Sequence, residues 1–175
     1  YILKKKNNFV EYLEYCKTSN SFDEFKNKYP DFTNNLIKNN IKINKIGNIK
    51  NLPKNVRSKL LESMKKTKKC NKILVNLAIN YGSQNEIIDA MRQIQKKKLS
   101  ISMKNLQNNL YTDGIVDPDI LIRSGGKKRL SNFLLWQMAY TEIYFVDKLW
   151  PDFKVTDYIK IINNFKKVKR NFGNI

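Results

Sequence analysis

The sequence of 175 residues contains no histidine, only two cysteines, and 15 acidic residues against 34 basic ones. The lack of histidine excludes Ser-His-Asp triads, Cys-His pairs, His-based metal sites and imidazole acid-base chemistry. Cys16 and Cys70 lie far apart without neighbouring ligands, so we expect free thiols in a reducing compartment rather than a zinc site or a disulfide framework. Any catalysis therefore has to use carboxylates, cations, hydroxyl groups, amides or a bound metal.

Long apolar runs are absent as well. No stretch approaches the roughly 20 residues needed to cross a bilayer, and the segment that starts at Tyr1 does not have the layout of a signal peptide. We therefore expect a soluble protein of the cytoplasm, or of an organelle lumen or stroma. The first residue is not methionine, so an upstream targeting segment stays an open alternative.

The net charge of +19 would attract polyanions, phosphorylated ligands or anionic membrane surfaces. Lysine is mixed with asparagine throughout, as in residues 34–40, which favours a composition bias spread over the surface. A basic nucleic-acid-binding domain is the alternative from another functional class. Because the sequence has neither a basic stripe with interleaved stacking aromatics nor a known motif of that class, we expect no nucleic-acid partner.

Apolar residues make up 41% of the chain, and helical and strand-like patterns alternate along it. This predicts an α/β fold, a single domain over residues 1–175 with a mostly parallel central sheet flanked by helices. Segment 72–79 is nearly continuous in apolar residues, like a central strand covered on both faces. Strands are predicted at 41–45, 72–79, 119–122 and 142–145, and helices at 5–16, from Ser21 with a break at Pro30, at 53–66, from Ser83, from Ser131, and from Thr156 or Asp157 to about Arg170.

The helix that opens at Ser83 has the pattern of a capping box, with Glu86 three residues later. Its predicted apolar face consists of Ile87, Ile88, Met91 and Ile94. The strand before it ends at Asn80, and another predicted strand ends at Arg123. Ligands of open parallel sheets bind at the carboxyl ends of strands, so these two positions are the first places to look for a site.

Residues 123–132 combine several features that bind phosphate groups. Arg123 and Arg129 supply guanidinium forks, Gly125 and Gly126 let backbone amides approach an anion, and Ser131 is predicted at a helix N-terminus with free amides. We expect these groups to converge on a diphosphate. The alternative is a glycine turn with solvated cations, in which Ser131 is an ordinary N-cap.

Longer segments around these residues resemble the C-terminal signature of cis-prenyltransferases, the undecaprenyl and dehydrodolichyl diphosphate synthases. The resemblance extends from about Ile41 to Gly173 and more loosely over the helix before Cys16. The segments that carry it are Asp119 to Gly126, Arg129 to Phe145, Leu149 to Phe153, and Asn76 to Gly82 followed by Glu86.

The resemblance implies a transferase that condenses isopentenyl diphosphate with an allylic prenyl diphosphate, such as farnesyl diphosphate, to make a Z-polyprenyl diphosphate. It implies that Arg123, Arg129 and Ser131 bind the diphosphate of isopentenyl diphosphate, and that Glu142 takes part in holding Mg²⁺, the cofactor. A hard carboxylate oxygen suits this ion, which keeps water and substrate phosphates as its other ligands.

The resemblance further implies a homodimer and an apolar tunnel for the growing chain, for which Phe22 and Phe25 are candidate lining residues. Product length does not follow from the sequence. Contact with a membrane surface through the product is a further expectation of this kind.

Two motifs of the family are not found in these residues: the Asp-Gly-Asn loop that supplies the essential aspartate, and a Ser-x-Glu-Asn-Trp segment. We therefore expect N-terminal and loop segments to be missing here, and the catalytic residue is unknown. Three residues also depart from the pattern. Lys127 and Lys128 stand where the family usually has a glutamate followed by glutamine or histidine, and Asn171 stands where it usually has an arginine. A non-catalytic or impaired subunit of a cis-prenyltransferase complex is the alternative.

Overall fold

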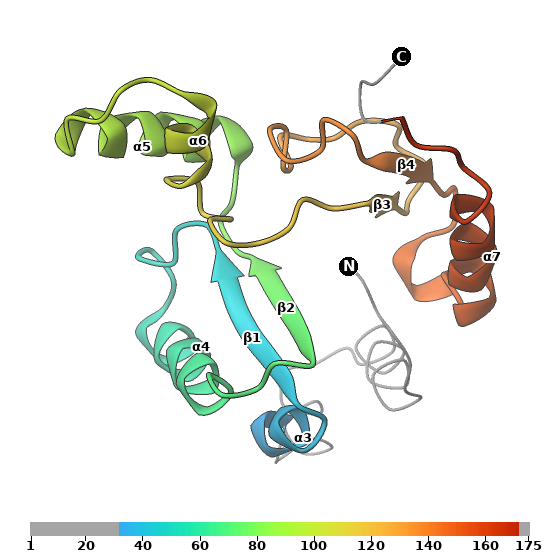
Figure 1. Ribbon diagram of the computed structural model, residues 1–175. Coiled ribbons are helices and arrows are strands. Elements are labelled where there is room, and N and C mark those ends of the chain that lie inside the picture. The colour runs from blue at the N-terminus through green and yellow to red at the C-terminus, as the bar shows by residue number, and fades with distance from the viewer. Residues whose placement is uncertain (1–31, 172–175) are drawn as a thin grey trace. The chain divides into compact units, whose positions relative to one another are not determined.

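The computed structural model describes residues 32–171 and confirms the α/β class with parallel strands (Figure 1). The helices expected at 5–16 and from Ser21, with Phe22 and Phe25, lie outside the described residues. No helix between residues 32 and 171 has both the length and the apolarity that crossing a membrane requires. The elements are α3 (Phe32–Lys38), β1 (Ile41–Ile46), α4 (Lys54–Lys66), β2 (Ile73–Ala78), α5 (Ser83–Lys96), α6 (Met103–Gln107), β3 (Ile120–Arg123), β4 (Glu142–Phe145), the 3₁₀ helix η1 (Trp150–Asp152) and α7 (Val155–Phe165).

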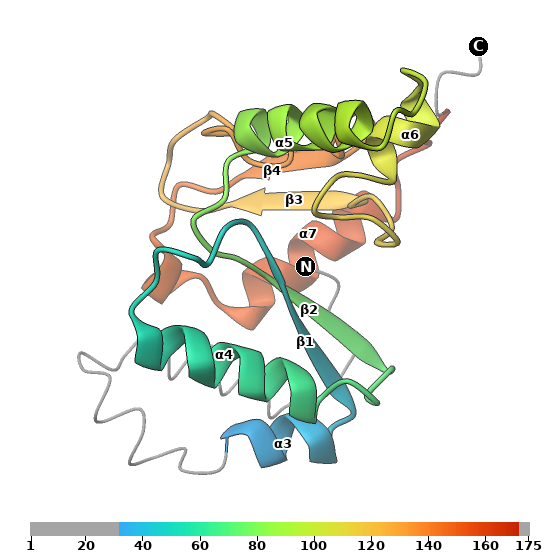
Figure 2. The ribbon, with the colours of Figure 1, turned by 90° about the vertical axis from the view of Figure 1, so that its left-hand side faces the viewer.

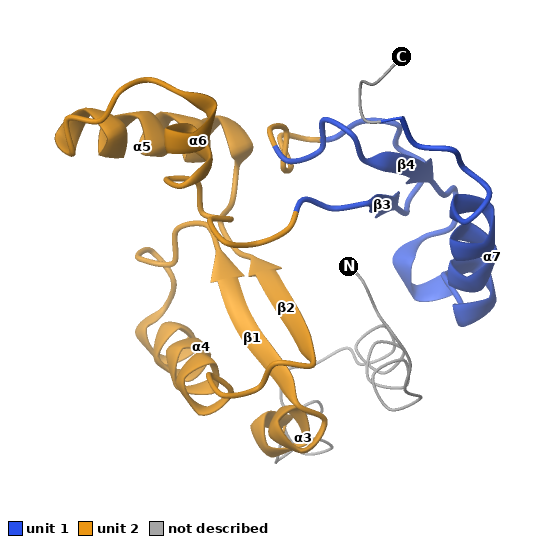
Figure 3. Cartoon of the chain, in the orientation of Figure 1, with its two compact units in different colours: residues 1–30, 117–130, 137–175 blue, residues 31–116, 131–136 orange. Residues whose placement is uncertain are grey.

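The described chain divides into two compact units (Figure 3). Unit 1 contains residues 117–130 and 137–171, and unit 2 contains residues 32–116 and 131–136. Each unit has one two-stranded parallel sheet, β3-β4 in unit 1 and β1-β2 in unit 2. The chain therefore leaves unit 1 after Leu130, contributes six residues to unit 2, and returns to unit 1 at Gln137.

In unit 2, β1 is the better buried strand. Ile41, Ile43 and Ile46 of β1 are buried, and both α3 and α4 contact this strand, as Figure 2 shows for α4. The prediction that residues 72–79 form a strand is confirmed, but the prediction that both of its faces are covered is wrong, because Leu74 is 42% exposed. Within the described residues β2 pairs only with β1, so one of its edges has no partner strand there.

Helix α4 begins where the sequence predicts, directly after Pro53, whose fixed φ suits a helix start. At its other end the fully buried Thr67 joins the helix to the sheet. The Thr67 hydroxyl accepts a hydrogen bond from the Ile43 amide at 3.1 Å and donates one to the Ser63 carbonyl at 2.8 Å.

Helix α5 begins at Ser83 as predicted, but the predicted capping box is wrong. Gly82 occupies the N-cap position, and no side chain of the N-cap residue caps the helix. The predicted apolar face is also wrong in part, since Ile88 and Met91 are exposed. The residues that are buried on α5 are Ser83, Glu86, Ala90 and Ile94.

The helix predicted from Ser131 does not form, and residues 131–140 are turns and bends. The backbone φ angles of Ser131, Asn132 and Leu134 are 50°, 61° and 47°. These values lie in the left-handed region, which a right-handed helix cannot contain. The final predicted helix is present as α7, where Asp157 accepts from the Lys154 amide at 2.8 Å, but it ends at Phe165 and does not reach Arg170.

We expect Gly47→Ala to lower the free energy of unfolding by about 2–4 kcal/mol. Gly47 follows β1 with φ +102°, and an added Cβ would lie 2.3 Å from the Ile79 carbonyl oxygen, a backbone atom. The matched control is Gly114→Ala, where φ is +71° but no atom lies within 4 Å of the added Cβ. Only conformational strain remains there, so a loss of about 1 kcal/mol is expected. Urea unfolding of both variants tests this, and equal losses would contradict it.

Candidate functional site

Residues 123–130, here called the arginine loop, leave the carboxyl end of β3 and turn back sharply at two glycines. Gly125 and Gly126 have φ angles of 90° and 70°, which favour glycine. The Gly125 amide donates to the Lys148 carbonyl at 2.8 Å, and the Gly126 amide donates to the Val146 carbonyl at 3.1 Å. The prediction that these amides face an anion is therefore wrong, because both fold the loop onto the chain after β4.

The structure brings Arg123 and Arg129 together on the arginine loop. The Arg123 guanidinium donates a hydrogen bond to the backbone carbonyl of Arg129. The Arg129 side chain is exposed, and its guanidinium makes no hydrogen bond or ion pair within residues 32–171. The loop thus has an internal support, Arg123, and a guanidinium fork at Arg129 that is available to an anion.

Ser131 follows the arginine loop but belongs to unit 2. It is exposed and has left-handed backbone geometry, so it is not the start of a helix. Its expected supply of free helical amides is therefore absent, while its hydroxyl remains a hydrogen-bonding group. The assignment of Ser131 to substrate binding stays a prediction.

Asn80, at the end of the strand before α5, takes part in a turn instead of facing a ligand. Its side-chain amide donates to the Asn48 carbonyl at 3.1 Å, and its own carbonyl accepts from the Asn48 amide at 3.4 Å. Of the two strand ends that the sequence singled out, the arginine loop is the one with available polar groups.

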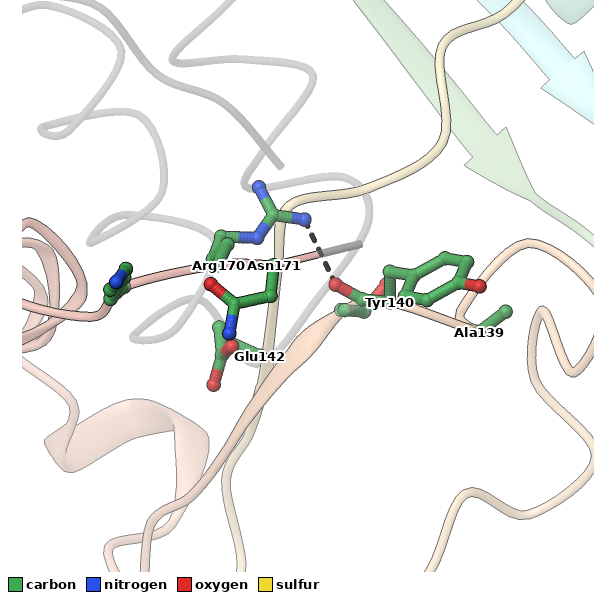
Figure 4. A pocket seen from close by; sticks show the side chains of 7 residues that line it. Ala139, Tyr140, Glu142, Arg170 and Asn171 are labelled. Atoms are coloured by element: carbon green, nitrogen blue, oxygen red, sulfur yellow. Dashed lines mark hydrogen bonds between the residues drawn. The ribbon is translucent and has the colours of Figure 1, made fainter. Parts of the chain in front are cut away.

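Glu142 is the first residue of β4 and lies in a hollow of about 260 Å³ (Figure 4). Its carboxylate is partly buried and makes no hydrogen bond or ion pair within the described chain. Arg170 closes one side of the hollow, because its guanidinium donates to the Tyr140 carbonyl at 2.9 Å and forms an ion pair with Asp119. The other lining residues are Ala139, Thr141, Lys169 and Asn171.

The register of β3 with β4 separates Glu142 from Arg123. Glu142 is paired with Ile120, and Arg123 is paired with Phe145, so the two residues lie at opposite ends of the parallel pair. Three residues of strand correspond to about 10 Å. The structure therefore does not bring the predicted metal ligand and the predicted diphosphate ligand Arg123 into contact.

The surroundings of Glu142 fit a magnesium ion that arrives with a diphosphate. No group of three or more acidic, histidine or cysteine side chains that could hold a metal is present between residues 32 and 171. One carboxylate beside Lys169 and Arg170 is a poor site for a bare divalent cation. It suits a cation whose other ligands are phosphate oxygens and water, because Lys169 can then contact the phosphates while Arg170 stays paired with Asp119.

A family model described as "Putative undecaprenyl diphosphate synthase", of the prenyltransferases, matches residues 10–173. The chain belongs to this family. The recognition of a cis-prenyltransferase from Asp119–Gly126 and Arg129–Phe145 is thereby confirmed. The match also covers the described residues of both compact units.

Relatives and solved structures agree with membership of the undecaprenyl diphosphate synthase family. An isoprenyl transferase of Oceanobacillus iheyensis is 42% identical over 147 residues, which are 80% of this chain and 58% of that protein. The crystal structure of a probable undecaprenyl diphosphate synthase from Campylobacter jejuni has a TM-score of 0.75 at 38% identity, covering 93% of this chain and 79% of the other.

A second solved structure is lavandulyl diphosphate synthase from Lavandula x intermedia in complex with dimethylallyl diphosphate. It has a TM-score of 0.77 at 26% identity and covers 97% of this chain and 73% of the other. The chain spans 53–62% of the length of the curated relatives that it matches.

In this family member, sequence reasoning missed a buried network around Glu86, which is fully buried on α5. Its carboxylate accepts from the Tyr81 hydroxyl at 2.5 Å and from the Tyr111 amide at 2.8 Å. The Tyr111 hydroxyl in turn donates to Asp89 at 2.5 Å. A capping box was the nearest local interpretation of Glu86; the real partner at Tyr111 lies 25 residues away and gives no local signal.

We expect the stability of the protein to fall as pH rises from about 10 to 12. Burial, followed by the hydrogen bond to Asp89, raises the pKa of Tyr111 to about 12, above the ordinary tyrosine pKa of 10.0. In that window the unfolded tyrosine loses its proton while the folded one keeps it, so deprotonation favours unfolding. Burial and Glu86 also raise the pKa of Tyr81, which acts in the same direction.

The measurement is urea unfolding at several pH values in this window. Tyr111→Phe should be less stable below pH 10 but should lose less stability on going to pH 12. Tyr140→Phe, which changes a tyrosine that is 58% exposed, is the matched control and should follow the parent protein. A Tyr111→Phe profile parallel to the parent's would show that this hydroxyl keeps an ordinary pKa.

Proposed function

We propose that the protein is a cis-prenyltransferase that condenses isopentenyl diphosphate with an allylic prenyl diphosphate, such as farnesyl diphosphate, to make a Z-polyprenyl diphosphate. The observation that supports this most directly is the family match over residues 10–173, which includes Arg123 and Arg129 on one loop. The names of the relatives point the same way, since these proteins are isoprenyl transferases and diphosphate synthases. One solved relative holds dimethylallyl diphosphate, an allylic diphosphate.

In the proposed reaction the arginine loop binds the diphosphate of isopentenyl diphosphate, which does not react. The available guanidinium of Arg129 forms paired hydrogen bonds with phosphate oxygens, Arg123 supports the loop and adds positive charge, and the Ser131 hydroxyl donates a further hydrogen bond. Fixing this end of the substrate orients its double bond toward the allylic carbon. Orientation of two bound reactants is a large source of rate enhancement.

The bond changes need no histidine. The allylic carbon–oxygen bond breaks, the isopentenyl double bond forms the new carbon–carbon bond, and one proton leaves to give the Z alkene. Negative charge accumulates on the departing diphosphate, so the protein has to supply cationic and hydrogen-bonding groups there. The charged group of Lys169 beside Glu142 is of this kind, whereas the guanidinium of Arg170 is already paired with Asp119.

Glu142 is the residue that would hold Mg²⁺, with phosphate oxygens and water as the remaining ligands. When bound, this ion neutralises charge on the diphosphate that departs. The chain itself presents the partly buried Glu142 carboxylate, which has no protein partner among residues 32–171. Glu142 is held in place because it is the first residue of β4. The Glu142 amide donates to the Asp119 carbonyl at 3.0 Å, which fixes that start.

The homodimer, the apolar tunnel and the contact of the product with a membrane belong to the same proposal. They rest on family membership. Phe22 and Phe25, the candidate tunnel residues, lie outside the described residues.

The proposal is tested with the full-length protein, farnesyl diphosphate, radiolabelled isopentenyl diphosphate and Mg²⁺, with the products separated by chain length. We expect label in polyprenyl products and loss of incorporation when EDTA removes the metal. Absence of incorporation with Mg²⁺ present would contradict the enzymatic proposal. Activity that appears only after addition of a partner chain would support the alternative of a non-catalytic or impaired subunit. Salt-dependent nucleic-acid binding without turnover would support the alternative of a basic nucleic-acid-binding domain.

We expect Arg129→Ala to reduce condensation by about 10²–10³-fold, because a phosphate-binding fork is lost. The backbone carbonyl that Arg123 uses remains in this variant, so the loop keeps its internal hydrogen bond. Arg129→Lys retains the charge without the fork, so its condensation rate should lie between those of the parent and Arg129→Ala. Arg123→Ala loses both the charge and the support of the loop, and it should also reduce condensation sharply. Turnover at the parent level in Arg123→Ala and Arg129→Ala would remove the arginine loop from the site.

Glu142→Gln should act through the metal. The amide has nearly the same shape as the carboxylate but no charge, so we expect sharply reduced condensation and a higher Mg²⁺ concentration at half-maximal activity. Arg129→Ala is the matched control, because it should raise KM for isopentenyl diphosphate without a comparable shift in the Mg²⁺ requirement. An unchanged Mg²⁺ dependence in Glu142→Gln would show that this carboxylate is not a ligand.

A further inference from the structure

Residues 131–136, here called the capping segment, close the N-terminus of α5 within unit 2. The Asn132 backbone carbonyl accepts from the Ser83 amide at 2.8 Å, and its side-chain oxygen accepts from the Gln84 amide at 2.9 Å. In the opposite direction the Leu135 amide donates to the Ser83 hydroxyl at 3.0 Å. Three hydrogen bonds therefore join the capping segment to the first turn of α5.

Asn132 has the properties that this position requires. Its φ of 61° is left-handed, a conformation that asparagine tolerates better than most residues. Its amide oxygen is a good acceptor for first-turn amides of a helix. The residue that occupies the N-cap position in the chain, Gly82, has no side chain to fulfil this role.

Gly82 in turn leaves the space that Asn132 occupies. A Cβ added at Gly82 would lie 2.8 Å from the Asn132 side-chain nitrogen, closer than carbon and nitrogen atoms approach without a shift. The φ of Gly82 is −152°, an extended conformation that alanine adopts freely. An alanine at this position would therefore displace the Asn132 side chain, although the backbone conformation itself accepts any residue. Packing of Tyr81 against Phe133, edge to face at 5.8 Å, adds to the same contact.

Ser131, which directly precedes Asn132, has a φ of 50°. A serine held in the left-handed region is unfavourable unless the surrounding structure fixes it. The hydrogen bonds of Asn132 and Leu135 to α5 supply that constraint on the residues that follow Ser131. The backbone that carries the Ser131 side chain is thus joined directly to a residue, Asn132, that is held by its contact with α5.

We propose that Asn132 is a positioning residue for diphosphate binding: by capping α5 with both its carbonyl and its side chain, it positions the neighbouring Ser131 for isopentenyl diphosphate, and Gly82 leaves the space that the Asn132 side chain occupies. This inference rests on the proposed function, because that function assigns Ser131 to the diphosphate. In this proposal Asn132 favours binding of a diphosphate group by the hydroxyl donor of Ser131.

The variants Asn132→Ala, Asn132→Asp and Gly82→Ala separate positioning from direct contact with substrate. Aspartate keeps the acceptor oxygen, and its charge is favourable at a helix N-terminus, so it retains the cap that alanine removes. If Asn132 positions Ser131, the aspartate variant binds better than the alanine variant. If the Asn132 amide itself donated to the diphosphate, aspartate would repel the anion and bind worse than alanine.

The experiment measures KM for isopentenyl diphosphate, KM for farnesyl diphosphate and kcat in the full-length protein, with thermal unfolding of each variant as a folding control. We expect Asn132→Ala to raise KM for isopentenyl diphosphate by about 10-fold or more, with less effect on KM for farnesyl diphosphate. Gly82→Ala should act in the same direction. In the double variant the second change should add little, because the two residues act through one contact.

Binding of inorganic pyrophosphate, measured by calorimetry, gives a readout that does not need turnover. A parent protein that binds pyrophosphate without condensing prenyl substrates would refute the proposed function. The positioning role would still be supported in that case if pyrophosphate affinity decreased from the parent to Asn132→Asp and further to Asn132→Ala. Condensation by the parent with an unchanged KM in Asn132→Ala, or with Asn132→Asp weaker than Asn132→Ala, would overturn the positioning role alone. A parent with neither activity nor pyrophosphate binding would overturn both.

Discussion

The amides in the first turn of α5 have no helical carbonyl to accept their hydrogen bonds, and this requirement shapes the region around them. Because Gly82 has no side chain, the acceptor comes from Asn132, 48 positions beyond Gln84. Meeting the requirement in this way fixes Asn132 in the left-handed region. The same hydrogen bonds that begin α5 therefore hold Asn132 in a conformation that a helix starting at Ser131 could not contain, and they constrain the direct neighbour of a residue proposed to bind substrate.

The parts of the fold that follow from nearby residues could be predicted from the sequence. Alternating isoleucines predict β1, an apolar run predicts β2, and Pro53 marks the start of α4. The predictions that failed depend on partners far along the chain. Glu86 has the spacing of a capping-box residue, yet its carboxylate bonds to Tyr81 and to Tyr111. Residues 131–140 have an apolar pattern at helical spacing, but tertiary hydrogen bonds outweigh that preference.

For the candidate site, the sequence predicts the types of chemical group but not their directions. The arginine loop follows β3 as expected, whereas its glycine amides bond to the carbonyls of Val146 and Lys148. Which donors remain available depends on how the chain after β4 returns past the loop, and this cannot be deduced from residues 123–130 alone. The same holds for Glu142, since strand register depends on pairing between distant segments.

The register of β3 with β4 has a consequence for charge. Asp119 and Asp157 are each consumed in an ion pair, with Arg170 and Lys148. The side chains of Glu142 and Arg129 form no ion pair within residues 32–171. Had Arg123 stood opposite Glu142, a guanidinium and a carboxylate would lie within ion-pairing distance and would neutralise each other. Placing them at opposite ends of the strand pair, about 10 Å apart along the strands, keeps the carboxylate available for a cation and the arginine loop available for an anion.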